Sequence, residues 1–403
     1  MAIIALCKGA YSLSGDFEKK LAEKSGYAVL TESALLRRTS ERFNVPVAKL
    51  LKALYHKQSV FNNFTQEKQR HLTYIQIELA ETLPDDKAIY EGFSSLLIPS
   101  DIYHVLRVCT ISDISNRRLE AVSTDNLSQR DASLKIQTLD NELNCLTQFL
   151  FKKSPWETSL YDILLPTDKV SEEEALSLIM ENAGKITMDS SVGQGALMAE
   201  MADFRLASKV KLRLIEDGHD VMVTSKGGEI TIVVNKHTLR LKKLEDELSG
   251  IAVTVAGVIK VSVVPGPDFN DEIYRKYDFD LPSRVLVVDD EKDFALTLSN
   301  RLQLRDIGTA AVFSGEEALN FVDEEMPEVL VLDLKMDGIS GLDVLREIKR
   351  KTPRVEVIIL TGHGTDEDKE IAMSLGAYAY FEKPVDINKL LVTIKDAHKK
   401  ARR

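Results

Sequence analysis

The sequence has few cysteines and no long apolar run. Its three cysteines, Cys7, Cys109 and Cys145, lie far apart in apolar surroundings, so we interpret them as buried thiols rather than as a disulfide framework or a metal site. No segment approaches the roughly 20 apolar residues that a membrane-spanning helix needs. The start, MAIIALCKG, lacks the basic segment and long apolar core of a secretory signal. We therefore expect a cytoplasmic chain without an integral membrane segment.

The sequence also lacks an excess of positive charge. With 52 basic and 63 acidic side chains, its formal net charge is -11. Binding to nucleic acid requires lysines and arginines clustered on one face, to neutralise phosphates. The basic residues at the C-terminus are interpreted as a solvated helix end, and no helix-turn-helix with a basic recognition face is evident. We therefore expect no nucleic-acid partner.

The length of 403 residues exceeds what one hydrophobic core usually supports, so it predicts two or three domains. Breaks in the pattern favour three domains and one linker. We place the domains at residues 1–185, 190–265 and 284–403, and the linker at residues 266–283, which begins in a Pro-Gly-Pro sequence and is acidic and aromatic.

The first two domains show different patterns. In residues 1–185, short apolar runs alternate with longer helical patterns, which is typical of an α/β domain; the runs are Ile3 to Cys7, Ala88 to Glu91, His104 to Cys109 and Tyr161 to Leu165. In residues 190–265 the predicted order is α-β-β-α-β. Gly227-Gly228 joins two alternating runs and predicts a hairpin, with which the last run, Gly257 to Val264, is expected to pair.

The C-terminal domain reads as five β-α units. Five apolar runs alternate with amphipathic helical segments, namely Val285 to Val288, Ala310 to Phe313, Val329 to Leu332, Val357 to Leu360 and Tyr378 to Phe381. Right-handed crossovers make such units a doubly wound, five-stranded parallel sheet, which carries ligand chemistry at the carboxyl ends of its strands. Polar residues stand at those ends: Asp289, Asp290, Asp333, Thr361 and Lys383.

This set of residue types predicts phosphoryl chemistry. Three close carboxylates repel one another unless a cation neutralises them, and hard oxygen ligands suit magnesium. With the metal and Lys383 screening the charge, Asp333 can act as a carboxylate nucleophile toward phosphorus and form an acyl phosphate. Thr361 can then donate a hydrogen bond to a phosphoryl oxygen.

Four motifs of this domain resemble those of bacterial response-regulator receiver domains, which have a flavodoxin-like fold. They are VLVVDD at 285–290, VLDLKMDGISG at 331–341, LTGHG at 360–364 and YFEKP at 380–384. By this resemblance Asp333 is the phosphoacceptor, and Asp290, Asp333 and the main-chain carbonyl of Lys335 bind Mg²⁺, with Asp289 supporting the waters of the metal. The resemblance also implies that Thr361 and Tyr380 form a switch pair and that the Lys383-Pro384 peptide bond is cis.

The N-terminal domain has the position of a phosphate-binding loop but not its residues. The first apolar run leads into residues 8–15 and then into a helical pattern. A phosphate loop needs glycines and a cation at the start of that helix. Here Leu13 interrupts the loop, Asp16 stands at the start of the helix, and no G-x-x-x-x-G-K-[ST] sequence occurs.

Four long segments of this domain nevertheless resemble the cytidylate kinase-like family of P-loop nucleoside monophosphate kinases: residues 19–36, 104–122, 127–142 and 161–179. The departures from the family fall on residues that serve its chemistry. Glu91-Gly92 stands where the family tends to place an arginine before glycine, and Leu143 or Asn144 stands where an arginine is expected after the aspartate matched by Asp140. We therefore expect a catalytically silent kinase fold and assign no nucleotide-binding residues.

The middle domain resembles the BON domain of bacterial envelope and stress proteins, through its pattern and through GVIKVSVV at 257–264. That resemblance implies a lipid-binding or partner-binding module. Because the chain shows no export signal, we favour a spacer or a protein-binding module.

Together these features predict a two-component response regulator. A histidine kinase or phosphotransfer protein would donate phosphate to Asp333, and the upstream domains would act on an unidentified output protein. A homodimer through residues 366–395 is one further expectation. The alternatives are a nucleoside monophosphate kinase gated by its receiver, acting on CMP-type substrates, and a scaffold in which the receiver only docks. We expect no enzyme activity beyond phosphorylation and dephosphorylation of the receiver itself.

Overall fold

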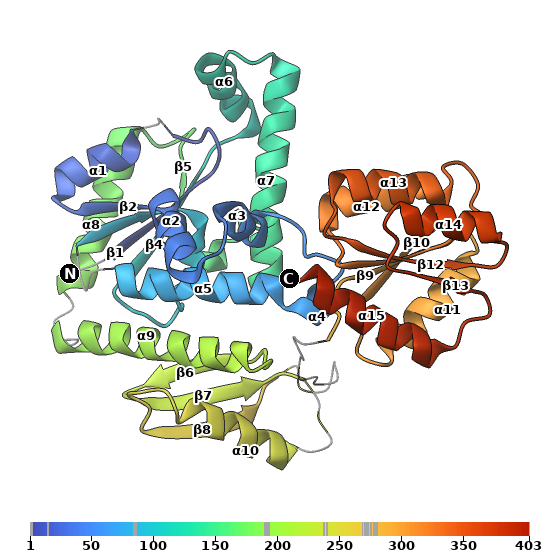
Figure 1. Ribbon diagram of the computed structural model, residues 1–403. Coiled ribbons are helices and arrows are strands. Elements are labelled where there is room, and N and C mark those ends of the chain that lie inside the picture. The colour runs from blue at the N-terminus through green and yellow to red at the C-terminus, as the bar shows by residue number, and fades with distance from the viewer. Residues whose placement is uncertain are drawn as a thin grey trace. The chain divides into compact units, whose positions relative to one another are not determined.

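A computed structural model shows the fold (Figure 1) and describes residues 3–13, 16–83, 87–188, 194–236, 238, 241–267, 269, 274, 276 and 281–402. Ser14, Gly15 and much of the predicted linker lie outside the described residues. The chain divides into two compact units. The first comprises Met1–Lys57 and Glu67–Lys276, and the second comprises Gln58–Gln66 and Tyr277–Arg403.

The first unit contains a five-stranded, fully parallel sheet, and its strands alternate with helices as predicted for an α/β domain. The strand order is β2-β3-β1-β4-β5. The strands are β1 (Ile3–Lys8), β2 (Ala28–Thr31), β3 (Ala88–Glu91), β4 (Val105–Ile111) and β5 (Ile163–Pro166). The run that forms β2 was not predicted to be a strand. It is short and lies at one edge of the sheet, where only one neighbour fixes it.

Helices cover both faces of this sheet. One face is packed by α1 (Phe17–Ser25) and α8 (Glu172–Met188). The opposite face is packed by α2 (Glu32–Phe43), α3 (Val47–Tyr55), α5 (Glu67–Thr82), the 3-10 turn η1 (Phe93–Leu97) and α7 (Gln129–Phe151). The remaining elements are α6 (Ile114–Asp125) and the 3-10 turn η2 (Thr158–Leu160). Among the described helices of the whole chain, none is both long and apolar enough to cross a membrane.

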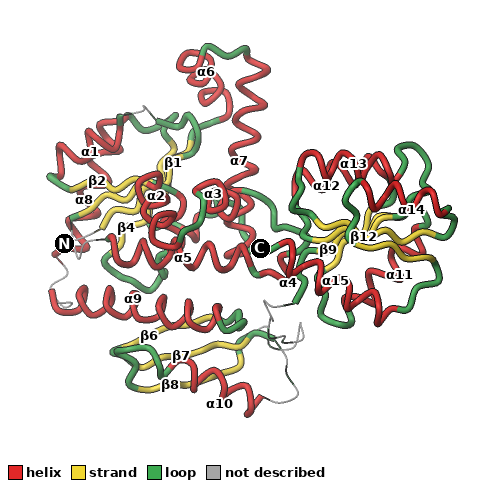
Figure 2. Tube along the Cα trace, in the orientation of Figure 1, coloured by secondary structure: helices red, strands yellow, loops and turns green. Residues whose placement is uncertain are grey.

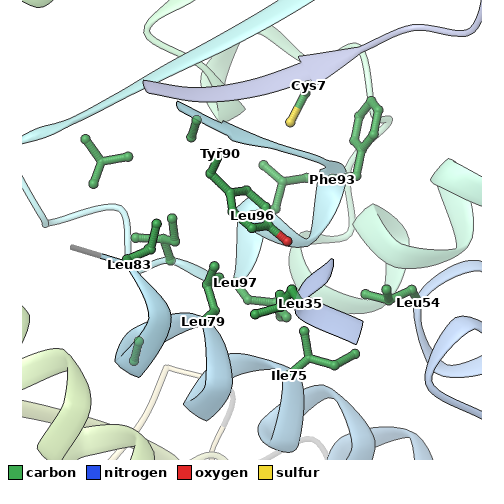
Figure 3. Close-up of a cluster of buried hydrophobic side chains, with 14 of the residues drawn as sticks. Cys7, Leu35, Leu54, Ile75, Leu79, Leu83, Tyr90, Phe93, Leu96 and Leu97 are labelled. Atoms are coloured by element: carbon green, nitrogen blue, oxygen red, sulfur yellow. The ribbon is translucent and has the colours of Figure 1, made fainter. Parts of the chain in front are cut away.

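The larger core of this unit lies between the sheet and α5. Figure 3 shows Cys7 and Tyr90 from adjacent strands directed at leucines of the helical layer. Cys7 and Cys109 are buried, as predicted. Cys145 is only partly buried, so that prediction was wrong for this residue. It lies on α7 between the buried residues Leu143 and Leu146.

The middle segment has the predicted order α-β-β-α-β. Its elements are α9 (Gln194–Glu216), β6 (Met222–Lys226), β7 (Glu229–Val234), α10 (Leu241–Ala252) and β8 (Lys260–Pro265). Strands β6 and β7 form an antiparallel hairpin, and β8 pairs with β7 in parallel. Gly227 and Gly228 have φ angles of 58° and 83°, which the two-residue turn requires and which side chains other than glycine adopt poorly. The resemblance to BON domains stays a prediction.

The second unit is built on another five-stranded parallel sheet, in the order β10-β9-β11-β12-β13, which confirms the predicted doubly wound architecture. The strands are β9 (Val285–Val288), β10 (Thr309–Val312), β11 (Val329–Leu332), β12 (Glu356–Thr361) and β13 (Ala379–Glu382). Figure 2 shows these strands side by side between two layers of helices.

The two helical layers bury opposite faces of this sheet. Helices α11 (Lys292–Gln303) and α15 (Ile387–Ala401) pack on one face. Helices α12 (Gly315–Glu325), α13 (Gly341–Lys351) and α14 (Asp366–Ser374) pack on the other. All four residues of β9 and of β11 are buried, which is the pattern expected for central parallel strands covered on both sides. The unit also includes the short helix α4 (Asn62–Thr65).

Candidate functional site

The polar residues that follow the central strands meet at the carboxyl edge of the second sheet. Asp289 and Asp290 follow β9, Asp333 follows β11 and Lys383 follows β13. Because all strands are parallel, their carboxyl ends share one edge, so residues far apart in the sequence become neighbours there. Asp289 and Asp333 are buried, with 2% and 5% of their surfaces exposed.

Main-chain contacts fix the position of Asp333. Its amide nitrogen donates to the carbonyl of Val288 at 2.9 Å, which continues the pairing of β11 with β9. Its Oδ1 accepts hydrogen bonds from the amide of Leu334 at 2.6 Å and from that of Lys335 at 3.3 Å. Gly341 passes close behind, where a Cβ atom would lie 2.1 Å from the carbonyl oxygen of Asp333. The carboxylate is therefore held in one orientation, with Oδ2 left for other partners.

Lys383 bridges two of the carboxylates. Its Nζ lies 2.7 Å from Oδ2 of Asp289 and 2.9 Å from Oδ2 of Asp333. It also lies 3.5 Å from Glu291 and over the ring of Phe294. Burial disfavours the charged ammonium, but the hydrogen bonds to Asp289 and Asp333 outweigh this and raise the pKa of Lys383. The Lys383-Pro384 bond is cis, as predicted.

The carboxylates carry more negative charge than Lys383 neutralises. One oxygen of each of Asp289, Asp290 and Asp333 lies within 4.8 Å of the others. Three carboxylates and one ammonium leave an excess of two negative charges. Burial raises the pKa of Asp289, and the hydrogen bond from Lys383 offsets only part of this effect. The available ligand atoms are all oxygens, and the net charge of the three carboxylates with Lys383 is -2. Both features fit a hard divalent cation such as Mg²⁺.

Thr361 and Tyr380 lie beside the same edge. Thr361 is fully buried at the end of β12, and its Oγ1 accepts a hydrogen bond from the amide of His363 at 3.5 Å. The Tyr380 hydroxyl is buried without a hydrogen-bond partner among the described residues. A Cβ atom on Gly364 would lie 1.7 Å from that hydroxyl and 2.8 Å from Cγ2 of Thr361. The ring is thus turned inward, into space that the absence of a side chain at Gly364 leaves.

The structure brings together the sequence-predicted residues Asp289, Asp290, Asp333 and Lys383. The main chain of Lys335 also lies beside Asp333, since its amide donates to Oδ1 of Asp333 at 3.3 Å. Three neighbours were not predicted, namely Glu291, Phe294 and Gly364. Gly364 had a signal in the LTGHG sequence, but only the packing of Tyr380 shows which of its two glycines matters. For Glu291 and Phe294 the sequence gives no signal, since Lys383 reaches them only across the sheet edge.

Comparison with known proteins agrees with this geometry. Residues 285–395 match the family model of the response regulator receiver domain. The C-terminal domain is a response regulator receiver domain. Residues 3–169 match the family model of the cytidylate kinase-like family, so the N-terminal part of the chain is similar to that family, and we call it the kinase-like domain. Receiver domains generally bind Mg²⁺ for phosphorylation and receive the phosphoryl group from a donor such as a histidine kinase.

The curated relatives match this chain over a length close to that of the receiver domain. An NtrX-like response regulator of Rickettsia typhi is 35% identical over 115 residues, which cover 28% of this chain and 24% of that protein. The transcriptional regulatory protein GlrR of Escherichia coli is 34% identical over 116 residues, covering 29% of this chain and 26% of that protein. The chain therefore aligns with only about a quarter of the length of each of these curated relatives, 24% and 26%. Among solved structures, the receiver domain of NtrX from Brucella abortus is 32% identical, covering 28% of this chain and 98% of that one, with a TM-score of 0.28.

The basic side chain at the start of the loop that follows β1 in the kinase-like domain is held in ion pairs with the chain's own carboxylates. Lys8 is the basic residue next to this loop, and its Nζ lies 2.6 Å from Glu18 and 2.8 Å from Glu91. Burial lowers the pKa of Lys8, but hydrogen bonds to these two carboxylates outweigh it, and the net shift is upward. A phosphate approaching Lys8 would have to displace two carboxylates, and it would meet Asp16 just before α1.

An arginine that contacts this loop is also held by the chain's own groups. Arg117 of α6 makes two hydrogen bonds to Asp140 of α7, at 3.0 Å and 2.7 Å. Its Nε donates to the carbonyl of Ala10 at 2.7 Å, and its guanidinium lies over the ring of Trp156. All of these contacts fix Arg117 as a structural residue that ties α6, α7 and the loop together.

Proposed function

We propose that this chain is a two-component response regulator. Asp333 accepts a phosphoryl group from a histidine kinase or a phosphotransfer protein, and the upstream domains pass the signal to another protein. The observation that carries the proposal is the contact of Lys383 with both Asp289 and Asp333, at the edge where Asp290 follows β9 and Thr361 ends β12. This is a nucleophilic carboxylate with its charge partners already in place.

The reaction at Asp333 transfers a phosphoryl group from a nitrogen of the donor to an oxygen of the carboxylate. One carboxylate oxygen forms a bond to phosphorus, and the bond from phosphorus to the donor's histidine nitrogen breaks. The imidazole leaves with the electron pair and takes up a proton from solvent. Asp289, Asp290, Asp333 and the carbonyl of Lys335 would hold Mg²⁺, which supplies positive charge next to the phosphoryl oxygens. Lys383, in contact with Asp289 and Asp333, supplies a second positive charge.

Thr361 and Tyr380 would report the modification. A phosphoryl oxygen on Asp333 gives the Thr361 hydroxyl a new acceptor, and movement of Thr361 changes the space beside the Tyr380 ring. The output would use protein contacts rather than nucleotide chemistry. In the kinase-like domain, Lys8 and Arg117 are held in internal ion pairs, so they are not free to bind phosphate groups. These same pairs argue against the alternative of a receiver-gated nucleotide kinase.

The proposed domains are residues 1–185, 190–265 and 284–403, with a linker at 266–283. The proposal also places the chain in the cytoplasm, where donor proteins are phosphorylated from ATP. The middle module serves as a spacer or a protein-binding module in this scheme.

Labelling with a small phosphodonor tests the proposal directly. The full chain, incubated with acetyl phosphate and Mg²⁺, should gain one phosphoryl group per chain, stable in acid and labile in base. Asp333→Asn should abolish the label. Asp337→Asn is the matched control, because this carboxylate lies on the same loop but is exposed. Full labelling of the Asp333→Asn variant, or labelling that persists in excess chelator, would show that the site is wrong.

A further inference from the structure

The second unit contains a segment that the receiver family model does not include. Residues 58–66 belong to this unit, although they come from between α3 and α5 of the kinase-like domain. The segment closes on itself. Amides of Asn62, Phe64 and Thr65 donate to main-chain carbonyls within it, and the amide of Phe61 donates to Oγ of Ser59 at 3.1 Å. It is therefore a compact turn with a defined shape.

Two side chains of the segment contact α12. The ring of Phe61 meets that of Phe321 edge-to-face, with centroids 5.7 Å apart and an interplanar angle of 86°. Phe61 is fully buried. The hydroxyl of Ser59 donates to Oε2 of Glu325 at 2.5 Å. An aromatic pair next to a charge-assisted hydrogen bond is a specific contact, because both depend on orientation.

A third contact uses a glycine of the receiver. A Cβ atom on Gly308 would lie 2.8 Å from Cβ of Phe64 and 2.2 Å from the carbonyl oxygen of Ser283. The segment therefore approaches the main chain at the point where β10 begins, and only glycine leaves room for it. Val60, in contrast, lies within the segment but is 55% exposed.

These contacts lie at the amino edge of the sheet, opposite the phosphoacceptor. Gly308 precedes β10, and Phe321 and Glu325 lie in the last turns of α12, which runs back from the carboxyl edge. Asp333 and Lys383 follow the carboxyl ends of their strands. The contact surface is thus separate from the chemistry at the carboxyl edge.

We propose that residues 58–66 are a docking element that fastens the receiver domain to the rest of the chain, with Gly308, Phe321 and Glu325 as its seat. The segment is covalently part of the kinase-like domain, so the contact is intramolecular and needs little intrinsic affinity. The receiver is then attached twice, through this segment and through the predicted linker. The proposed attachment is at the amino edge of the receiver sheet, whereas Asp333 follows the carboxyl end of its strand. This inference does not depend on the proposed function.

Hydrogen exchange of the full chain tests the docking element. Phe61→Ala should raise exchange several-fold in residues 305–326, which hold the seat, and Phe321→Ala should raise it in residues 58–66. Val60→Ala is the matched control and should change neither segment. Labelling of Asp333 should remain as in the wild type for Phe61→Ala. Exchange in residues 305–326 that is equal in Phe61→Ala and wild type would overturn the proposal.

Cross-linking provides a readout that keeps Phe61 in place. In a Cys145→Ser background, Ser59→Cys with Glu325→Cys should be joined rapidly by a short bis-maleimide, since the native side chains touch. Ser59→Cys with Asp366→Cys is the control, because α14 begins at the carboxyl edge. Adding Phe61→Ala should slow the first reaction at least several-fold. Equal rates for the two cysteine pairs would show that residues 58–66 are not seated on the receiver.

Discussion

The ammonium nitrogen of Lys383 lies 2.9 Å from Oδ2 of Asp333, although β12 separates their two strands in the sheet. The same nitrogen lies 2.7 Å from Asp289. Lys383 therefore replaces part of the positive charge that the three carboxylates require, and it competes with a metal ion for the same oxygens.

Replacing Lys383 by methionine should separate these two roles. Loss of the ammonium should slow labelling by a small phosphodonor at least about tenfold, which corresponds to about 1.4 kcal/mol of transition-state stabilisation. It should also tighten Mg²⁺ binding, because the carboxylates lose a competing cation. Titration calorimetry with Mg²⁺ and a labelling time course measure both effects. Lys351→Met, on the exposed side of α13, is the control. Unchanged labelling in Lys383→Met would contradict this role.

Gly364 should control the position of Tyr380. Gly364→Ala places a methyl group where the Tyr380 hydroxyl lies, so the ring should turn outward and exchange of amides in β13 should rise. Gly362→Ala is the matched control, because the nearest atom to a Cβ added there would be Cδ of Lys383, at 3.7 Å. Hydrogen exchange of both variants, with and without a beryllofluoride phosphate mimic, measures the effect. A full response to the mimic in Gly364→Ala would show that Tyr380 needs no space at this position.

Phosphorylation should strengthen self-association through residues 366–395. The exposed charges there, which include Lys369, Glu370 and Lys389, can form complementary pairs across a two-fold axis. A beryllofluoride mimic with Mg²⁺ should raise the sedimentation coefficient or slow hydrogen exchange in this segment, and Thr361→Ala should blunt the change. If wild type binds the mimic and shows neither response, the receiver serves as a docking or phosphate-sink module.

The kinase-like domain should not transfer phosphate from ATP to CMP, dCMP or UMP. Catalysis of phosphoryl transfer consists almost entirely of positioning and charge stabilisation, and here Lys8 and Arg117 are bound to the chain's own carboxylates. The full chain should show neither turnover nor saturable ATP binding, as measured by a coupled assay and a titration. Turnover within the usual kinase range of about 1 to 100 per second would support the gated-kinase alternative instead.

Much of the site could be predicted because parallel strands obey a simple rule. The apolar runs at Val285 and Val329 are buried on both faces, so their length and position are visible in the sequence, and the residues that follow them must share one edge. Asp289, Asp333 and Lys383 were found in this way. The contact of Glu291 with Lys383 could not be found, because it depends on how a loop folds across that edge.

The sequence by itself determined the two parallel sheets, the hairpin at Gly227-Gly228 and the residue types at the receiver edge, because periodicity and turn chemistry are local properties. Only the tertiary structure decided three other matters. Gly364 makes room for Tyr380, Arg117 and not a neighbouring arginine pairs with Asp140, and residues 58–66 join the receiver unit. Each depends on packing between segments far apart in the chain, where shape and the satisfaction of buried polar groups decide which of many similar residues meet.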